Sequence, residues 1–145
     1  FDRGQRNKEL DQRIGSEAVS MRRVLTASDF ISLHVPLTKQ TRHIIGKPEL
    51  QSMKKTAVLI NTSRGPVVDE RALSRALKNK VIFAAGIDVF EFEPKVSPEL
   101  LKLDNIVMTP HTASATVEAR EGMAVLAAKN IIAVLEGRPP LNSVS

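Results

Sequence analysis

The apolar residues of this chain gather in four short runs. The runs cover residues 28–36, 56–61, 81–90 and 105–110, and each is apolar at both odd and even positions. A short continuous apolar run is typical of a strand buried on both faces, as in a parallel sheet. The pattern therefore predicts four parallel strands.

Between these runs, apolar residues recur at spacings of three and four, which predicts helices. Asp69 is a plausible N-cap for the second helix, and the third begins at Ser114 as its cap and stops at Gly137. Alternating strands and helices indicate an α/β fold, a doubly wound parallel sheet with helices on both sides. The predicted helices cover residues 47–53, 70–80 and 114–137.

Polar and ionisable side chains follow each predicted strand. In open parallel sheets the ligand binds outside the carboxyl ends of the strands. The four exits read HVPLT, NTSRGP, DVFEFEP and TPHTASAT, and they carry Arg64, Asp88, Glu93 and His111. Each of these residues alone has a structural explanation, such as a surface cation or a turn cap. Because all four fall at the same edge of the sheet, a shared site is the better interpretation.

The residue types at this edge suit chemistry on a small carboxylate. An arginine fork such as Arg64 can hold a carboxylate in two hydrogen bonds and polarise an adjacent carbonyl. A histidine such as His111 can give or take a proton near neutral pH, and a carboxylate such as Glu93 would orient the ring. With a hydride acceptor alongside, the set predicts interconversion of a 2-hydroxy acid and a 2-oxo acid.

Composition narrows the class of protein. The chain has 145 residues and is 42% hydrophobic, which favours one packed core. Its net charge of +5 raises the question of nucleic acid, but Trp and Tyr are absent and the cations are dispersed, so a solvated basic surface is favoured. Cysteine is absent, which excludes disulfides and zinc-thiolate sites and fits a cytoplasmic protein; no metal site is predicted. The apolar runs are too short for a membrane span.

Four long segments carry a family resemblance. These are SDFISLHVPLTKQTRHIIG, MKKTAVLINTSRGPVVDERALSRAL, AAGIDVFEFEP and NIVMTPHTASAT. In this order they resemble the D-isomer-specific 2-hydroxyacid dehydrogenases, which include phosphoglycerate, glyoxylate, hydroxypyruvate and D-lactate dehydrogenases. The resemblance implies a Rossmann-like domain, an NAD cofactor and a homodimer.

The resemblance also assigns roles. Arg64 matches the substrate-binding arginine, His111 the acid-base, and Glu93 the acid that supports it. Asp88 matches the aspartate that contacts the nicotinamide carboxamide. Other matched positions lie along the cofactor: Val35, Pro36 and Thr41 beside the adenosine and pyrophosphate, Thr62 and Ser63 on the nicotinamide side, and Ala113 and Ser114 after the histidine. His34 and His43 receive no catalytic role, and packing or hydrogen bonding is expected of both.

One family feature is missing. No G-x-G-x-x-G occurs in the chain, although that glycine loop lets the backbone approach the pyrophosphate. The start FDRG resembles the end of the second strand of the cofactor domain. We therefore expect the C-terminal part of a longer enzyme that is inactive alone, with residues 1–113 from the NAD-binding domain and residues 114–145 forming a helix and tail that return toward the substrate domain.

The sequence leaves the cofactor, the type of activity and the substrate open. Asp2 would accept the ribose hydroxyls and favour NAD, yet Arg3 and Arg6 could pair with the 2′-phosphate of NADP. Formate or phosphite dehydrogenases share the plan, although Glu93 stands where formate enzymes place an amide. A dinucleotide-sensing binding protein or co-repressor on the same scaffold is the alternative from another class. The resemblance gives no identity for the 2-hydroxy acid.

Overall fold

The computed structural model describes residues 8–143. They divide into two compact units, one up to Pro110 and one from His111 onward, and each unit is described by itself. The expected domain boundary at residue 113 stays a prediction.

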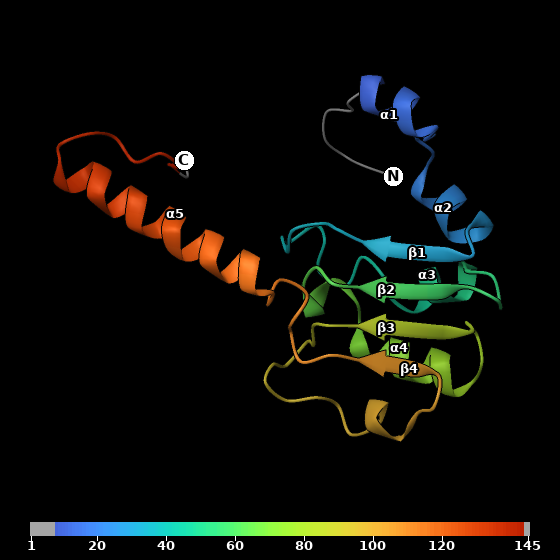
Figure 1. The fold of residues 1–145 in the computed structure, drawn as a ribbon. Coiled ribbons are helices and arrows are strands. Elements are labelled where there is room, and N and C mark those ends of the chain that lie inside the picture. The colour runs from blue at the N-terminus through green and yellow to red at the C-terminus, as the bar shows by residue number, and fades with distance from the viewer. Residues whose placement is uncertain (1–7, 144–145) are drawn as a thin grey trace. The chain divides into compact units, whose positions relative to one another are not determined.

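The first unit is built on one parallel four-stranded sheet in the order β1-β2-β3-β4 (Figure 1). The four predicted strands are confirmed in order, with shorter bounds. Leu33, Asn61, Ile87 and Met108 are partners across the sheet, so all four strands end at the same level. The bounds are β1 Phe30–Leu33, β2 Val58–Asn61, β3 Ala84–Ile87 and β4 Ile106–Met108.

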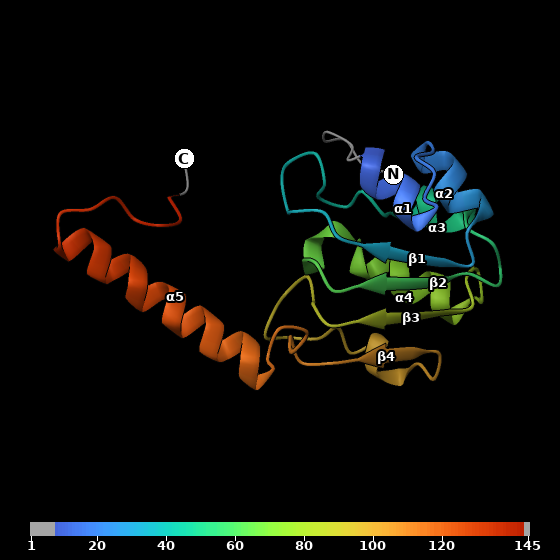
Figure 2. The same cartoon turned by 45° about the horizontal axis from the view of Figure 1, so that its top comes forward.

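Three helices of this unit cover one face of the sheet. α2 (Met21–Ala27) packs on α3 (Lys47–Ser52), and α3 packs on α4 (Glu70–Lys78). Figures 1 and 2 show α3 and α4 behind the strands. Alternate strand residues point into this layer and are buried there: Ile31, Leu33, Leu59, Ala85 and Ile87.

Among the described residues of the first unit, no helix covers the other face of the sheet. Phe30 and Val107 are 72% and 71% exposed there. The Rossmann-like α/β class is confirmed, but the expectation of helices on both faces is met on one face only within this unit. Burial along the strands alternates with a period of two. The sequence did not reveal this alternation, because the outward-facing positions are apolar as well.

The helix caps follow local chemistry. The Asp69 carboxylate accepts from the Ala72 N–H at 2.9 Å and caps α4 as predicted. Pro48 lies in the first turn of α3, where proline suits the helix start. Four short elements were not predicted from the sequence. Ser20 is the N-cap of one of them, α2, and was the sequence signal for that helix. The four elements are α1 Lys8–Ile14, α2, and the 3-10 helices Gly65–Val67 and Leu100–Lys102.

The second unit consists of a loop, α5 (Val117–Leu135) and a tail. The prediction that Ser114 caps this helix is wrong. Thr116 is the N-cap, because its side chain accepts from the Ala119 N–H at 3.1 Å. Gly137 ends the helix with φ +74°, as predicted. Among residues 8–143 no helix is both long and apolar enough to cross a membrane.

Candidate active site at the carboxyl ends of the strands

The exits of β1 and β2 form a pocket of about 600 Å³. Because the strands end at the same level, the chain segments that follow them lie next to one another. The pocket brings together five residues that the sequence assigned to cofactor or substrate: Val35, Pro36, Thr62, Ser63 and Arg64. Its full lining is His34, Val35, Pro36, Leu37, Thr62, Ser63 and Arg64.

The buried amide of Asn61 shapes the exit from β2. Asn61 is 1% exposed, its Nδ2 donates to the Arg64 carbonyl at 3.1 Å, and its Oδ1 accepts from the Ser63 N–H at 3.1 Å. The Ser63 hydroxyl donates to the same Oδ1 at 2.9 Å. These bonds satisfy backbone groups that have left the sheet. Sequence analysis gave Asn61 no role, and an amide at the end of an apolar strand was the available signal.

The Arg64 side chain is exposed at this exit. Its Nη1 donates to the Ser63 carbonyl at 2.7 Å, which orients the guanidinium from within its own turn. An exposed and tethered arginine fork at the mouth of a pocket is suited to an anionic group of a ligand.

Gly65 lets the Arg64 turn lie directly on the segment that follows β3. A Cβ at this position would stand 1.9 Å from the Phe90 carbonyl oxygen and 2.6 Å from the Glu91 nitrogen. Glycine is therefore required by the close approach of two backbones. The contact fixes the distance between the turn that carries Arg64 and the loop that carries Glu93.

Asp88 and Glu93 are both held by hydrogen bonds after β3. Asp88 is 3% exposed, its N–H donates to the Asn61 carbonyl at 3.0 Å, and its Oδ1 accepts from the Thr109 hydroxyl. Glu93 accepts from the Phe90 N–H at 2.9 Å through Oε1. Both carboxylates thus occupy defined positions at the edge where the sequence placed them.

Thr41 organises the loop after β1. It is 9% exposed, and its hydroxyl donates to the Pro36 carbonyl at 2.6 Å and accepts from the Thr38 N–H at 2.7 Å. Through these bonds Thr41 belongs to the same turn as Val35 and Pro36, with which the sequence had grouped it.

The remaining predicted residues lie elsewhere. His111, Ala113 and Ser114 belong to the second unit, so the approach of His111 to Arg64 and Glu93 stays a prediction. Asp2, with the neighbouring Arg3 and Arg6, lies outside the described residues.

All three histidines were given a use from the sequence. His111 has a left-handed backbone with φ +54°, which is uncommon for a residue with a side chain. His43 and Lys80 share that conformation, so it does not mark a catalytic residue by itself. His34 and His43 make the hydrogen bonds expected of them, His34 with the Ser32 hydroxyl at 2.8 Å and His43 with Glu91 at 2.8 Å.

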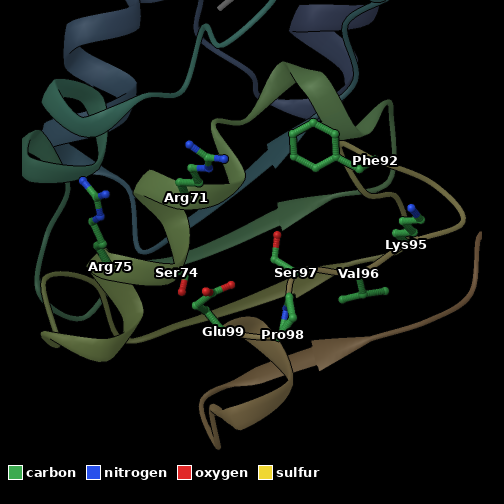
Figure 3. A pocket seen from close by; sticks show the side chains of 9 residues that line it. All are labelled: Arg71, Ser74, Arg75, Phe92, Lys95, Val96, Ser97, Pro98 and Glu99. Atoms are coloured by element: carbon green, nitrogen blue, oxygen red, sulfur yellow. The ribbon is translucent and has the colours of Figure 1, made fainter.

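A larger pocket, of about 800 Å³, lies between α4 and the loop at 92–99 (Figure 3). Its lining includes Arg71, Arg75 and Lys95 but none of the residues that the sequence assigned to cofactor or substrate. This pocket is larger, but the smaller pocket lies where the strand exits converge. Because ligands of open parallel sheets bind at the carboxyl ends of the strands, we assign the site to the smaller pocket. Within the described residues, no cluster of His, Asp and Glu could hold a metal ion.

This chain is similar to proteins of a known family. Residues 1–113 match the family model described as D-isomer specific 2-hydroxyacid dehydrogenase, NAD binding domain. The chain belongs to this family. The predicted family resemblance is confirmed by this match.

Relatives in the family are named as reductases. A glyoxylate reductase of Thermococcus litoralis is 57% identical over 140 residues, which are 97% of this chain and 42% of that protein. The crystal structure of a glyoxylate reductase from Paecilomyes thermophila has a TM-score of 0.90 at 38% identity and covers 98% of this chain and 43% of its own. An NADPH-dependent glyoxylate/hydroxypyruvate reductase of Sinorhizobium meliloti, in complex with NADP and malonate, has a TM-score of 0.83 at 37% identity, over 87% of this chain and 40% of its own. The chain thus spans less than half the length of these family members.

The strand-end pocket fits part of a nicotinamide dinucleotide. Val35, Pro36 and Leu37 offer an apolar wall, and Thr62 and Ser63 offer hydroxyls on the opposite exit. Arg64 adds a charged group, so the lining combines apolar surface with hydrogen-bonding groups.

Proposed function

We propose that this chain supplies the dinucleotide-binding and acid-binding parts of an enzyme that reduces small 2-oxo acids to D-2-hydroxy acids. The observation that carries the proposal is the pocket shared by the exits of β1 and β2, where Val35, Pro36, Thr62, Ser63 and Arg64 meet. The names of the relatives point to glyoxylate and hydroxypyruvate as the substrates to test first.

Arg64 binds the carboxylate of the substrate in this proposal. Its exposed guanidinium lies at the pocket, and Nη1 donates a hydrogen bond to the Ser63 carbonyl, which favours this orientation. The same fork polarises the adjacent carbonyl, so the carbonyl carbon becomes a better hydride acceptor.

His111 donates a proton to the carbonyl oxygen of the 2-oxo acid, and Glu93 orients and stabilises the protonated ring. The hydrogen bond from the Phe90 N–H keeps the Glu93 carboxylate in place for this role. Hydride transfer is the chemistry that a bound nicotinamide dinucleotide supplies.

The residues that would hold the cofactor are those that the family resemblance assigns to it. We propose NAD as the cofactor, because Asp2 would accept the ribose hydroxyls, and NADP is the alternative that the Sinorhizobium meliloti relative makes necessary to test. The proposed cofactor residues are Asp2, Val35, Pro36, Thr41, Thr62, Ser63, Arg64, Asp88, His111, Ala113 and Ser114. A homodimer, a cytoplasmic location and the absence of nucleic-acid and membrane partners remain proposals based on the family and on composition.

The test uses a chimera in which the N-terminal part of the Thermococcus litoralis glyoxylate reductase precedes Phe1. The chimera should oxidise NADH when glyoxylate or hydroxypyruvate is added, and more efficiently than NADPH. His111→Ala should lower kcat by at least about 100-fold because the proton donor is lost. The 145-residue chain alone, which has no glycine loop, should show no turnover.

Folding and cofactor binding of the chimera are checked separately, by circular dichroism and by NADH fluorescence. A folded chimera that binds NADH and turns over no 2-oxo acid would contradict the enzyme proposal and favour the sensing protein. Unchanged turnover in His111→Ala would remove the role of that residue.

A further inference from the structure

We propose that Glu70 and Glu91 form a clasp that positions Arg64 and Glu93 relative to each other. The glutamate clasp, meaning the side chains and N–H groups of these two glutamates, makes them positioning residues of the site. This inference rests on the proposed function only in its kinetic part. The hydrogen bonds themselves can be tested on the 145-residue chain.

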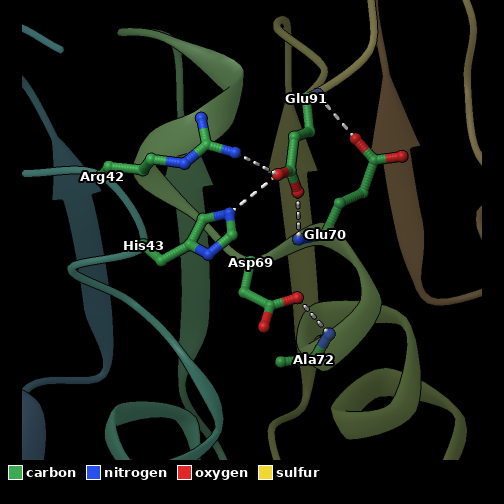
Figure 4. Close-up of polar contacts among 6 residues, drawn as sticks. All are labelled: Arg42, His43, Asp69, Glu70, Ala72 and Glu91. Atoms are coloured by element: carbon green, nitrogen blue, oxygen red, sulfur yellow. Dashed lines mark hydrogen bonds and ion pairs between the residues drawn. The ribbon is translucent and has the colours of Figure 1, made fainter.

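The two glutamates hold each other's backbone. The Glu91 N–H donates to Glu70 Oε2 at 2.8 Å, and the Glu70 N–H donates to Glu91 Oε2 at 3.3 Å (Figure 4). Glu70 Oε1 also accepts from the Ser97 N–H at 3.1 Å. One buried carboxylate thus ties α4 to two points of the loop after β3, and the other carboxylate returns the bond.

Both carboxylates are almost fully buried. Glu70 is 3% exposed, and the Glu91 side chain is 6% exposed. Arg42 Nη2 donates to Glu91 Oε1 at 3.1 Å, and His43 Nε2 lies 2.8 Å from the same oxygen. Glu91 therefore joins three separate segments of the chain at one point.

Such an arrangement costs desolvation, and apolar side chains would stabilise the fold as well or better. What carboxylates add is direction, because each oxygen accepts from a donor at a set position. The loop from Asp88 to Ser97 contains no helix or named strand, so its backbone depends on such bonds for a fixed path.

The clasp acts on both sides of the candidate site. On one side, the backbone N–H of His43 donates to the Pro66 carbonyl at 2.8 Å. The segment whose side chains bind Glu91 therefore also holds the turn after Arg64. On the other side, the Phe90 N–H binds Glu93 at 2.9 Å, one residue from Glu91. Displacement of Glu91 would therefore move the Arg64 turn and the Glu93 carboxylate together.

Amide exchange followed by NMR on the 145-residue chain tests the clasp. Glu70→Ala should accelerate exchange of the Glu91 and Ser97 amides by about tenfold, and Glu91→Ala should do the same for the Glu70 amide. Glu99→Ala is the matched control, because Glu99 lies two residues after Ser97 and its side chain makes no cap hydrogen bond. Rates that change no more than in this control would overturn the clasp.

A milder variant covers the case in which alanine prevents folding. Glu70→Gln keeps one acceptor oxygen and replaces the other with an NH₂ group. Because the two Glu70 oxygens serve different donors, exchange should accelerate at only one of the Glu91 and Ser97 amides. Equal protection of both amides in a folded Glu70→Gln chain would contradict the inference.

Kinetics of the chimera then test positioning. In Glu91→Ala the KM for glyoxylate should rise about tenfold, and by more than the KM for NADH, because the acid-binding turn moves. Glu91→Gln should recover part of the loss. If amide exchange accelerates in Glu91→Ala but the glyoxylate kinetics do not change, the clasp exists without a positioning role, and the proposal is overturned. An inactive parent chimera would count against the proposed function, while the amide exchange still decides the clasp.

Discussion

At the scale of single residues, the site depends on positions where the surrounding contacts require one residue type. Gly65 is required because two backbones meet there, and Asn61 is required because its amide binds the turn that carries Arg64. Such residues determine where the functional groups lie without touching a ligand.

Gly65→Ala should destabilise the chain strongly. The added methyl would stand 1.9 Å from the Phe90 oxygen, so the backbone must shift, and we expect a loss of about 3 kcal/mol in the free energy of unfolding by urea. Gly122→Ala is the control, since nothing lies within 4 Å of its added Cβ in α5. That control should be neutral or stabilising by up to about 1 kcal/mol. Equal stability of the two variants would contradict the close approach.

Arg64→Lys should impair substrate binding although the positive charge is kept. A lysine cannot reproduce the two-point grip of a guanidinium, so kcat/KM of the chimera for glyoxylate should fall by about 10- to 100-fold. Arg71→Lys, an exposed change outside the strand-end pocket, should leave kcat/KM unchanged. If Arg64→Lys matched that control, Arg64 would not bind the carboxylate.

Some residue roles could be predicted from the sequence and others could not. Asp69 was foreseen as a cap because a cap and its N–H partner are close in the chain. Glu70 and Glu91 were not singled out, because a glutamate is normally exposed and their partners lie 21 residues away. Pairing across such a distance depends on the fold and leaves no local pattern.

At the scale of elements, order was predictable and detail was not. Four strands and three helices follow from apolar runs and helical spacing, and all seven exist. The burial of the strands on one face was missed because Phe30 and Val107 are apolar yet exposed. The position of the α5 cap was missed because SATVE offers two hydroxyls, at Ser114 and Thr116.

Thr116→Ala should destabilise the first turn of α5. The hydroxyl is lost as acceptor for the Ala119 N–H, and caps of this kind are worth about 1 kcal/mol. Hydrogen exchange of the amides in the first turn should accelerate accordingly. Ser114→Ala, a change of a neighbouring hydroxyl outside the helix, should leave those amides unaffected, and the reverse result would restore Ser114 as the cap.

The start of α5 should also weaken in acid. A hydrogen bond from its own backbone, and then one with the Thr116 side chain, lower the pKa of Glu118 below its usual 4.5. A lowered pKa means that the ionised form stabilises the folded helix, so this contribution is complete above pH 4.5 and is lost as pH falls through the lowered pKa. NMR titration of amide protection in the first turn should show this loss. Glu118→Gln should abolish it, and a pH dependence that survives in Glu118→Gln would contradict the assignment.

At the scale of the whole molecule, the proposed catalytic set is divided between two units. Arg64 and Glu93 lie in the first, with one backbone packed on the other, and His111 opens the second. The sequence could order these residues along a common edge because parallel strands all end on one side. It could not supply the path of the chain after β4, since that path depends on packing beyond the sheet.

The shared site of Arg64, Glu93 and His111 is tested most directly by a crystal structure of the chimera with NADH and oxalate, an unreactive acid. We expect the cofactor along Val35, Pro36, Thr62 and Ser63, with the oxalate bound by both outer nitrogens of Arg64 and the His111 ring between the acid and Glu93. Oxalate and cofactor bound away from the exits of β1 and β2, or His111 on another surface, would contradict it.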